Sequence, residues 1–438
     1  MKHLLPLFLL AALSCNTQGQ GYTSYHTGSS TDITTSPEGG ICLMGGATED
    51  DNAMVWFLER AQGGDVLVLR ASGSDGYNDY FYSDLGVTLN SVETIVFNNI
   101  TAASSSYIHE KIAGAEAIWF AGGDQYDYVT YFRDTPIKDL LNEAITERNI
   151  VVGGTSAGMA IMGEYYFSAE NGTITSEQAL ANPYHPNITV EGDEFLLNHH
   201  LQHVVTDTHY DDPNRKGRHV VFMSRIFNDY DIPAKGIACE EYVAVCVTPE
   251  GIASVYGEYP AYDDFAYFIQ TNCEVAQNEQ APSTCEPNTP LTWDADGEAL
   301  FTYQVPGTST GSNYFNLNNW TEGVGGQWQI WTVDTGELIE EQGDQPHCYA
   351  AVQEVSADTL TIIYPNPANK FISIEFTEGL NPEHIRISSS NGDVVIERVI
   401  KRNDNIRVDT STLPSGLYVV ETLYSNGQVS TEKLLLQN

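Results

Sequence analysis

The stretch Val151-Val152-Gly153-Gly154-Thr155-Ser156-Ala157-Gly158 decides the fold. An apolar run ends here at two glycines, and the small residues around Ser156 lead into residues 159–162, which are typical of a helix start. A serine in the pattern G-x-S-x-G is typical of a sharp strand-to-helix turn that exposes the hydroxyl. Glycine-sized neighbours permit such a turn, and the amides at the helix start point to where an oxyanion would form. The alternative is an ordinary glycine-rich connection between a strand and a helix.

The chain is long and strongly acidic. Its 438 residues predict two or three domains. With 59 acidic and 19 basic residues, the formal net charge is −40. A field of this sign repels phosphate backbones and anionic lipid surfaces, which argues against nucleic-acid or membrane-surface binding. It suits a cationic substrate, although solubility outside the cell explains it as well.

The first residues are typical of a secretory signal. Two basic residues precede an apolar run of ten, which is too short to span a bilayer, and small polar residues follow. We therefore predict a signal peptide over residues 1–20, with acylation at Cys15 as the alternative to ordinary cleavage. Residues 21–38 are rich in Ser, Thr and Gly, and this composition predicts a flexible leader.

The cysteines outside the signal peptide fall into two groups. In an oxidising compartment an even number of them permits disulfides. Those in polar, loop-like sequence are the best candidates for a bridge: Cys273, Cys285 and Cys348. Those in apolar runs are expected to be small core residues: Cys42, Cys239 and Cys246. The sequence contains no C-x-x-C pair, so it predicts no structural zinc site.

Apolar strands alternate with helical segments from residue 41 to the serine turn. The predicted strands are residues 41–44, 65–69, 93–98, 115–121 and 149–152. The predicted helices between them are residues 50–61, 104–113 and 137–148. Continuously apolar strands in this order predict a mostly parallel α/β sheet flanked by helices. Functional loops gather at the carboxyl ends of such strands, where Gly45-Gly46, residues 122–125 and Ser156 all lie.

The second half of the chain has a different character. Residues 188–255 are predicted to be rich in strands, including residues 196–205 and 219–226, and residues 257–350 are aromatic and rich in Gly and Thr. Short alternating strands separated by turn residues then predict a small antiparallel β-sandwich over residues 361–438. We expect residues 351–360 to be a linker.

A serine nucleophile needs a nearby base, and the base needs an orienting carboxylate. Among eleven histidines, His209 stands out because it follows a strand and lies among acidic and basic residues. A solvated loop is the alternative for this segment. His199, His200 and His203 have a spacing that imitates metal ligands, but no carboxylates accompany them, so no metal site is predicted.

Four collinear motifs in residues 39–255 resemble those of cyanophycinase and its relatives in peptidase family S51. The motifs are residues 120–125 (F-A-G-G-D-Q), 152–158 (V-G-G-T-S-A-G), 207–210 (D-T-H-Y) and 236–241 (G-I-A-C-E-E). The resemblance implies a class I glutamine-amidotransferase-like α/β fold, with residues 39–350 as the peptidase domain. Within it, residues 39–255 are the core and residues 257–350 a β-rich extension.

Carried over position by position, the resemblance implies a catalytic triad. Ser156 is the nucleophile, His209 the general base and Glu241 the carboxylate that orients it. The expected oxyanion donors are the amides of Gly123 and Ala157. No metal or organic cofactor is implied. Without the resemblance, an acid at a strand end on the surface is the alternative for Glu241.

The family's substrate is cyanophycin, a polyaspartate backbone with arginine attached to its side chains, which is cut to β-aspartyl-arginine dipeptides. The positions that resemble the family's substrate-binding residues are Gln125, Asp207, Arg215 and Arg218. Guanidinium groups bind carboxylates in bidentate fashion, and a carboxylate binds a guanidinium. The chain departs from the family's pattern at Thr208, where glutamine is usual, and at Pro213, where a basic residue is usual. Asp211 and Asp212 add negative charge there.

The end of the chain resembles the C-terminal sorting domain of the type IX secretion system. The resemblance rests on Tyr364-Pro365-Asn366-Pro367-Ala368, Leu413-Pro414-Ser415-Gly416-Leu417-Tyr418 and Lys433-Leu434-Leu435. It implies contact with that machinery, export through the periplasm and outer membrane, and a secreted or cell-surface location.

The sequence thus predicts a secreted serine exopeptidase that hydrolyses cyanophycin or related isoaspartyl peptides through an acyl-enzyme. One alternative is an S51-type peptidase for another acidic peptide. Another is a non-catalytic surface binding module, which the aromatic residues Trp320, Trp328 and Trp331 suggest. The oligomeric state is left open, with a homodimer among the choices.

Overall fold

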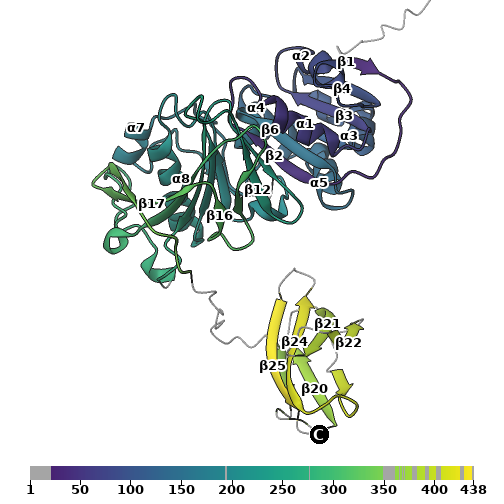
Figure 1. Ribbon diagram of the computed structural model, residues 1–438, viewed down its shortest axis with the longest axis vertical. Helices are drawn as coiled ribbons and strands as arrows, with labels where there is room; N and C mark the ends of the chain where they lie inside the picture. Colours follow the sequence, from purple (N-terminus) through teal and green to yellow (C-terminus); the bar gives the residue numbers. More distant parts are fainter. Residues whose placement is uncertain are drawn as a thin grey trace, which may run out of the picture. The chain divides into compact units, whose positions relative to one another are not determined.

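The computed structural model consists of two compact units, residues Met1–Tyr349 and Ala350–Asn438 (Figure 1). It describes residues 21–348 apart from 193–194 and 276. In the second unit it describes residues 361–436, apart from 365, 367, 369, 377–381, 390–393, 401–405 and 425–428. The predicted signal peptide and linker lie outside the described residues.

A ten-stranded mixed sheet organises the first part of the first unit, in the order β1-β4-β3-β5-β6-β2-β11-β12-β15-β16. Its parallel centre consists of β4 (Ser91–Phe97), β3 (Asp65–Arg70), β5 (Ala117–Phe120), β6 (Val151–Thr155) and β2 (Gly40–Met44). Antiparallel strands extend it on the far side of β2, namely β11 (Ala244–Val247), β12 (Ile252–Tyr256), β15 (Asn313–Asn316) and β16 (Gly323–Val324). The α/β fold predicted from the alternating pattern is confirmed.

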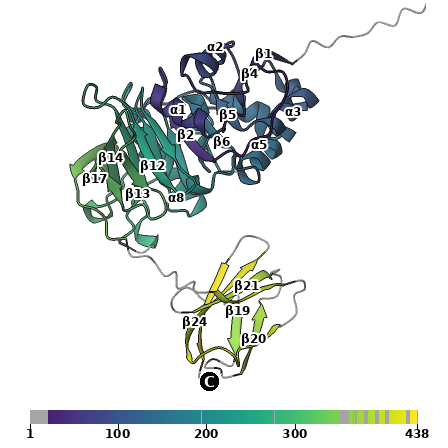
Figure 2. The same ribbon diagram turned by 45° about the vertical axis from the view of Figure 1, so that its right-hand side comes forward.

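Helices cover both faces of the parallel strands (Figure 2). Helix α1 (Asp51–Glu59) and the π-helix η1 (Tyr80–Asp84) pack on the face where Val66 and Val68 point. Helices α3 (Ser106–Gly114) and α5 (Pro136–Thr146) pack on the face of Leu67 and Leu69. Successive strand residues point to opposite faces, so a strand covered on both sides must be continuously apolar. In the part of the chain that the structure describes, no helix has the length and apolarity needed to cross a membrane.

The predicted flexible leader over residues 21–38 is wrong at its start, because residues Tyr22–Gly28 form the edge strand β1. This strand pairs antiparallel with β4, and its side chains contact a buried carboxylate. Ser24 Oγ donates a 2.5 Å hydrogen bond to Glu93, and the ring of Tyr22 stacks on that of Tyr107 at 5.8 Å. The polar composition suggested disorder, but cross-strand partners supply the ordering energy that the segment lacks by itself.

A second, six-stranded sheet lies in the order β18-β17-β14-β13-β10-β9. Its strands are β9 (Val204–Asp207), β10 (Lys235–Cys239), β13 (Phe265–Thr271), β14 (Leu300–Pro306), β17 (Gln327–Asp334) and β18 (Glu337–Gln342). Only the β9–β10 pair among these neighbours is parallel in the described residues. The residues after 257 thus complete the sheet that carries two of the predicted motifs.

The strand predicted over residues 219–226 is wrong, because helix α8 spans Lys216–Tyr230. The run His219-Val220-Val221-Phe222-Met223 is rich in β-branched and aromatic residues, which favours a strand by local propensity. All five of these side chains are buried, so the helix lacks the polar face that would reveal its period. The predicted strand at residues 196–205 is confirmed only at its end, where β9 begins.

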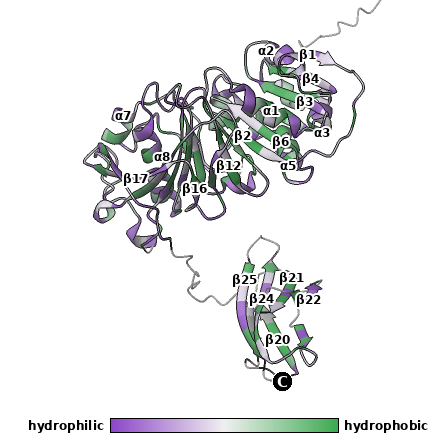
Figure 3. Ribbon diagram, viewed as in Figure 1, coloured by the Kyte–Doolittle hydropathy of each residue, from purple (hydrophilic) through white to green (hydrophobic). Residues whose placement is uncertain are grey.

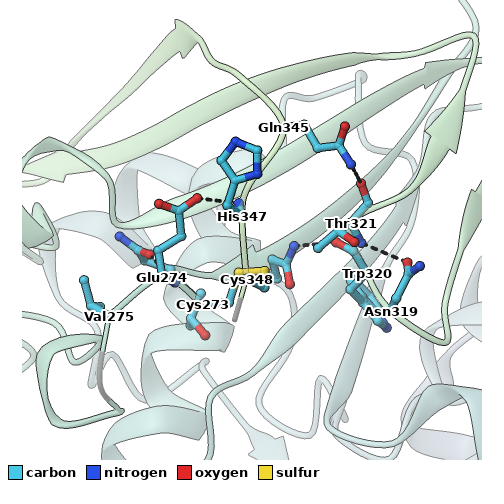
Figure 4. The surroundings of a disulfide bond; sticks show 12 residues. Cys273, Glu274, Val275, Asn319, Trp320, Thr321, Gln345, His347 and Cys348 are labelled. Atoms are coloured by element: carbon cyan, nitrogen blue, oxygen red, sulfur yellow. Dashed lines mark hydrogen bonds between the residues drawn. A yellow bond between two sulfur atoms is a disulfide. The ribbon is translucent and has the colours of Figure 1, made fainter. Parts of the chain in front are cut away.

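A disulfide closes the last described part of the first unit (Figure 4). Cys273, just after β13, is bonded to Cys348, and their Cα atoms are 4.9 Å apart. Of the three cysteines predicted as candidates, Cys285 is instead buried as a free thiol. Cys42, Cys239 and Cys246 are buried free thiols, as expected from their apolar context.

The second unit contains two antiparallel sheets with a shared apolar core. One sheet consists of β19 (Thr361–Tyr364), β20 (Phe371–Phe376) and β23 (Ile406–Asp409). The other consists of β22 (Val394–Val399), β21 (Pro382–Ser389), β24 (Gly416–Tyr424) and β25 (Val429–Leu436). Hydrophobic and hydrophilic residues alternate along these strands (Figure 3), and Ile372, Ile385, Val420 and Leu434 are among the buried ones. The predicted antiparallel domain is confirmed.

Candidate active site

Ser156 lies on a strained turn between β6 and the single-turn helix α6 (Ala157–Ala160). Its φ is 52° and its ψ is −115°, a region that non-glycine residues rarely adopt. The turn is possible because the residues two positions before and after Ser156 are glycines. A Cβ on Gly154 would lie 2.6 Å from the carbonyl carbon of Gly158, and one on Gly158 would lie 2.1 Å from the carbonyl oxygen of Phe120. Because α6 is one turn long, its individual amides matter here more than a helix dipole.

His209 and Glu241 complete a series of hydrogen bonds with Ser156. The Oγ of Ser156 lies 2.7 Å from Nε2 of His209, and Nδ1 of His209 lies 2.6 Å from Oε1 of Glu241. The side chains of His209 and Glu241 are 23% and 25% exposed, so the imidazole is accessible to a substrate yet partly shielded from water. A carboxylate at Nδ1 holds the proton there and leaves Nε2 free to accept the proton of the serine hydroxyl.

Backbone contacts between three strand ends hold the histidine and the glutamate in place. The amide of His209, which follows β9, donates to the carbonyl of Gly45 at 2.9 Å. The amide of Glu241, which follows β10, donates to Oδ1 of Asp211 at 3.0 Å. The amide of Tyr242 donates to the carbonyl of Gly46, at the end of β2, at 3.2 Å. These contacts join residues that are far apart in the sequence into one rigid edge.

The absence of a side chain at Gly46 leaves space for the imidazole of His209. The φ of Gly46 is 129°, and a Cβ at this position would lie 2.3 Å from Cε1 and 2.5 Å from Nε2 of His209. Any side chain here would displace the ring from Ser156. The glycine that the sequence placed at the end of the first parallel strand is therefore required by close packing.

The two predicted oxyanion donors lie beside the serine turn. Ala157 directly follows Ser156, and Gly123 has a φ of 151° in the loop after β5. A Cβ on Gly122 would lie 3.5 Å from Cβ of Ser156, so this loop packs against the turn. The role of the two amides stays a prediction.

The predicted substrate-binding residues separate into two pairs. Gln125, at the start of α4 (Gln125–Tyr128), donates to the carbonyl of Phe167 at 3.3 Å and is partly exposed. Arg215 is also partly exposed and donates to the carbonyl of Thr208 at 3.0 Å. Burial and the charge of Arg218 lower the pKa of Arg215, while Asp207, Glu241 and Asp211 oppose this shift. Both side chains lie where a substrate group has access.

Asp207 and Arg218 bind each other, and their predicted contact with substrate stays a prediction. The guanidinium forms a bidentate pair with the carboxylate, with Nε–Oδ2 at 2.8 Å and Nη2–Oδ1 at 2.5 Å. Both residues are 3% exposed. Burial alone would raise the pKa of Asp207, but the charge and hydrogen bonds of Arg218 outweigh burial and lower it. This pair fixes the start of α8 to the end of β9, two residues before His209.

Glu240, the neighbour of Glu241, was not among the site residues predicted from the sequence. Glu240 is 7% exposed, accepts hydrogen bonds from the hydroxyl of Tyr267 and the amide of Phe265, both at 2.8 Å, and points into the second sheet. The doublet Glu240-Glu241 after an apolar strand was the available signal, because one of two adjacent strand residues must point inward.

An acidic cavity of about 740 Å³ is lined by residues that follow two of the site's strand ends. It includes Tyr242, which follows Glu241, and Thr48, two residues after Gly46. The carboxylates around it are Glu49, Asp50, Asp51, Glu258 and Asp264. Burial raises the pKa values of Glu49 and Asp50, against hydrogen bonds that lower them. The sequence did not reveal this cavity because its carboxylates come from distant loops.

The histidines with metal-like spacing do not gather around a common point. His199 and His200 lie in the 3-10 helix η4 (His199–Leu201), and Nε2 of His200 contacts the carbonyl of Pro249 at 2.8 Å. Within the described ranges, no group of three or more His, Cys, Asp or Glu side chains is arranged to hold a metal ion.

Comparison with protein-family models finds two matches. Residues 65–255 match peptidase family S51, and residues 362–437 match the secretion system C-terminal sorting domain. The first unit therefore contains a region similar to peptidase family S51. The second unit contains the sorting-domain match, which indicates type IX secretion, so the protein is secreted or lies at the cell surface.

The curated relatives include two cyanophycinases. The cyanophycinase of Trichormus variabilis is 24% identical over 127 residues, which are 29% of this chain and 39% of that protein. The cyanophycinase of Synechococcus elongatus is 27% identical over 137 residues, covering 28% of this chain and 42% of the relative. The chain thus spans about two fifths of the length of the curated relatives it matches.

Two solved structures are similar to the first unit. One is a peptidase from an acI-B1 Actinobacterium, 14% identical, covering 51% of this chain and 89% of that one with a TM-score of 0.38. The other is a putative peptidase E from Listeria monocytogenes EGD-e, 16% identical, covering 50% of this chain and 98% of that one with a TM-score of 0.33.

Proposed function

We propose that this protein is an exported serine peptidase that cleaves cyanophycin or related isoaspartyl peptides through an acyl-enzyme. The observation that carries the proposal is the hydrogen-bond series from Ser156 through His209 to Glu241. A hydroxyl, an imidazole and a carboxylate in this order are the arrangement that activates a serine for attack on a carbonyl.

In the proposed reaction, Oγ of Ser156 attacks the scissile carbonyl carbon while Nε2 of His209 takes its proton. Glu241 stabilises the imidazolium, and the amides of Gly123 and Ala157 stabilise the oxyanion. His209 then gives the proton to the leaving nitrogen, the C–N bond breaks and an ester to Ser156 remains. Water attacks the ester with His209 again as base, which frees the acid and restores the hydroxyl.

The charges around the triad support a substrate with a cationic group. The acidic cavity beside Tyr242 contains five carboxylates, and a guanidinium or ammonium group on the substrate would be attracted to it. Arg215 provides a positive charge on the side of Thr208, suited to a substrate carboxylate. An isoaspartyl dipeptide unit that carries arginine combines both charges, as the cyanophycin unit does.

A peptidase for another acidic peptide is the second candidate. Pro213 lacks the positive charge of the family's usual basic residue, and Asp211 and Asp212 add negative charge near the histidine. These changes weaken the expected grip on a polyaspartate backbone, so a substrate other than cyanophycin stays a candidate. The binding-module alternative has less support, because Trp320 is 3% exposed and Trp331 is fully buried. Trp328 is partly buried and packs against the same core as Trp320.

The test is hydrolysis by the purified protein of cyanophycin and of β-aspartyl dipeptides with and without a cationic side chain, followed by mass spectrometry of the products. We expect β-aspartyl-arginine from cyanophycin and little hydrolysis of dipeptides without the cation. Ser156→Ala should abolish hydrolysis, and Ser83→Ala, at an exposed serine on η1, should leave it unchanged. Full activity in Ser156→Ala would exclude the mechanism, whereas activity on other acidic peptides alone would favour the second candidate.

A further inference from the structure

Glu240 joins the end of β10 to the start of β13. Its backbone amide donates to the carbonyl of Phe265 at 3.1 Å, and its Oε2 accepts from the amide of Phe265 at 2.8 Å. Its other oxygen, Oε1, accepts from the hydroxyl of Tyr267 at 2.8 Å. One buried carboxylate therefore fixes the chain immediately before Glu241 to the neighbouring strand.

A row of side-chain hydrogen bonds crosses the second sheet and ends at this carboxylate. Nε1 of Trp331 on β17 donates to Gln329 at 2.8 Å, and Nε2 of Gln329 donates to Gln304 on β14 at 2.9 Å. Nε2 of Gln304 donates to the hydroxyl of Tyr267 on β13 at 3.0 Å, and Tyr267 donates to Glu240. Every donor in the row points toward Glu240, so each bond polarises the next in the same direction.

The same connection reaches the proposed triad through two short steps. Glu241 directly follows Glu240, and its Oε1 lies 2.6 Å from the imidazole of His209. The amide of Tyr210 donates to the carbonyl of Cys239, and the ring of Tyr210 lies 5.0 Å from that of Tyr267. A shift of Tyr267 or Glu240 would therefore move both the glutamate and the histidine relative to Ser156.

We propose that Tyr267 and Glu240 are positioning residues, through which the sheet formed by residues 265–342 holds Glu241 and His209 in reach of Ser156. This inference rests on the proposed function of the triad. It gives the strand-rich residues after 257 a role in the reaction, since Phe265 and the hydroxyl of Tyr267 both bind Glu240 at the strand end that carries Glu241.

The ionisation of Glu240 makes the connection sensitive to pH. Burial raises the pKa of Glu240 to about 7, while the hydrogen bonds from Tyr267 and Phe265 oppose this shift. The charged groups that face Glu240 are Asp211, which raises its pKa, and Lys216 at the start of α8, which lowers it. Lys216 is paired with Glu340 on β18 at 2.7 Å. Protonation of Glu240 places a hydrogen on one of its two accepting oxygens, which weakens the bond from Tyr267 or the bond from the amide of Phe265. The proposed support therefore weakens as the pH falls through about 7.

The test uses the full chain and a fluorophosphonate that labels reactive serines, with the labelling rate measured between about pH 5 and pH 9. In Tyr267→Phe the rate should fall about 10-fold. The pH below which labelling fails should move upward, because losing the hydrogen bond raises the pKa of Glu240 further. The control is Tyr303→Phe on β14, whose hydroxyl accepts from the amide of Gly326 in the other core and should leave rate and profile unchanged.

A second variant, Glu240→Gln, keeps the size of the side chain and removes its ionisation. The fluorophosphonate should label this variant more slowly than the wild type. The change in labelling rate near pH 7 should disappear from its pH profile. Combined with Tyr267→Phe it should cause less loss than the sum of the two single changes, because both changes weaken the same group of contacts. Glu240→Gln also provides the test if Tyr267→Phe fails to fold.

The outcomes separate this inference from the proposed function. If the wild type is labelled at Ser156 and both variants match it in rate and profile, the positioning role is wrong and the triad stands. If Ser156→Ala is labelled or hydrolyses substrate as the wild type does, the proposed function is wrong. Slower labelling with an unchanged pH profile in both variants would also overturn the inference, because it indicates a purely structural effect.

Discussion

At the scale of single residues, the proposed reaction depends on side chains that are partly exposed but are held in place by several hydrogen bonds. Ser156, His209 and Glu241 come from three strand ends, and the amide of each donates to a group on another segment, namely the carbonyls of Met44 and Gly45 and the carboxylate of Asp211. The pair Asp207–Arg218 and the buried Glu240 are the supports behind them. Such supports matter because a reacting group displaced by a fraction of an ångström loses most of its effect.

Glu241→Gln tests the orienting role of the carboxylate. The amide keeps the shape of the side chain but cannot stabilise the imidazolium, and it favours the wrong tautomer of His209. We expect kcat to fall by about 100-fold or more with a small change in KM. The measurement is steady-state hydrolysis of the substrate that the screen identifies. Glu250→Gln, at an exposed turn, is the control, and an unchanged kcat in Glu241→Gln would assign the orienting role to another acid.

At the scale of elements, the site is an edge where strand ends from two sheets meet. β2, β5 and β6 of the first sheet bring Gly46, Gly123 and Ser156, and β9 and β10 of the second bring His209 and Glu241. Glycines replace side chains where these ends approach one another, and the positions of Gly46 and Gly158 leave no room for a Cβ.

Gly46→Ala tests this close approach. The new methyl group would overlap the ring of His209, so the ring must turn away from Ser156. We expect hydrolysis and fluorophosphonate labelling to fall by about 100-fold, because the general base is lost from its position. Gly76→Ala is the matched control, since a Cβ there meets nothing within 4 Å. Labelling of Gly46→Ala at the wild-type rate would show that the histidine has another position available.

The sequence predicted the elements that carry a strong local pattern and missed those defined by tertiary contacts. The apolar strands ending at Gly46 and Ser156 were readable because burial on both faces removes alternation. α8 was misread because its first turns are buried all round, and β1 was missed because its order comes from pairing with β4. Asp207, Arg218 and Glu240 show the same limit at the site. Their partners lie far along the chain, and no spacing rule reveals which carboxylate is paired and which is free.

At the scale of the whole molecule, the chain combines a unit that contains the region similar to peptidase family S51 with a unit that contains the sorting-domain match. The net charge of −40 gave no information about the triad. The disulfide Cys273–Cys348 marks the end of the described part of the first unit.

Reduction of this disulfide provides a test at that scale. The bridge closes a loop with a sequence separation of 75 residues, and its loss should lower the free energy of unfolding by about 4 kcal/mol through the entropy of the unfolded chain. Chemical denaturation with and without a reductant measures the change. Cys42, Cys239, Cys246 and Cys285 are already thiols, so the reductant acts on one bond among the described cysteines. The double variant Cys273→Ser/Cys348→Ser should match the reduced protein and stop responding to reductant; equal stability in all forms would contradict the prediction.

The position of the Cys273–Cys348 disulfide also determines which strand carries a pulling force on the chain beyond residue 348. β18 is the edge strand of its sheet, the kind of strand that peels away first when its end is pulled. The crosslink lies beyond β18 and attaches residue 348 directly to Cys273, at the end of β13 in the interior of the sheet. A pulling force on the chain beyond residue 348 is therefore transmitted to the end of β13 in the interior of the sheet and bypasses the edge strand β18.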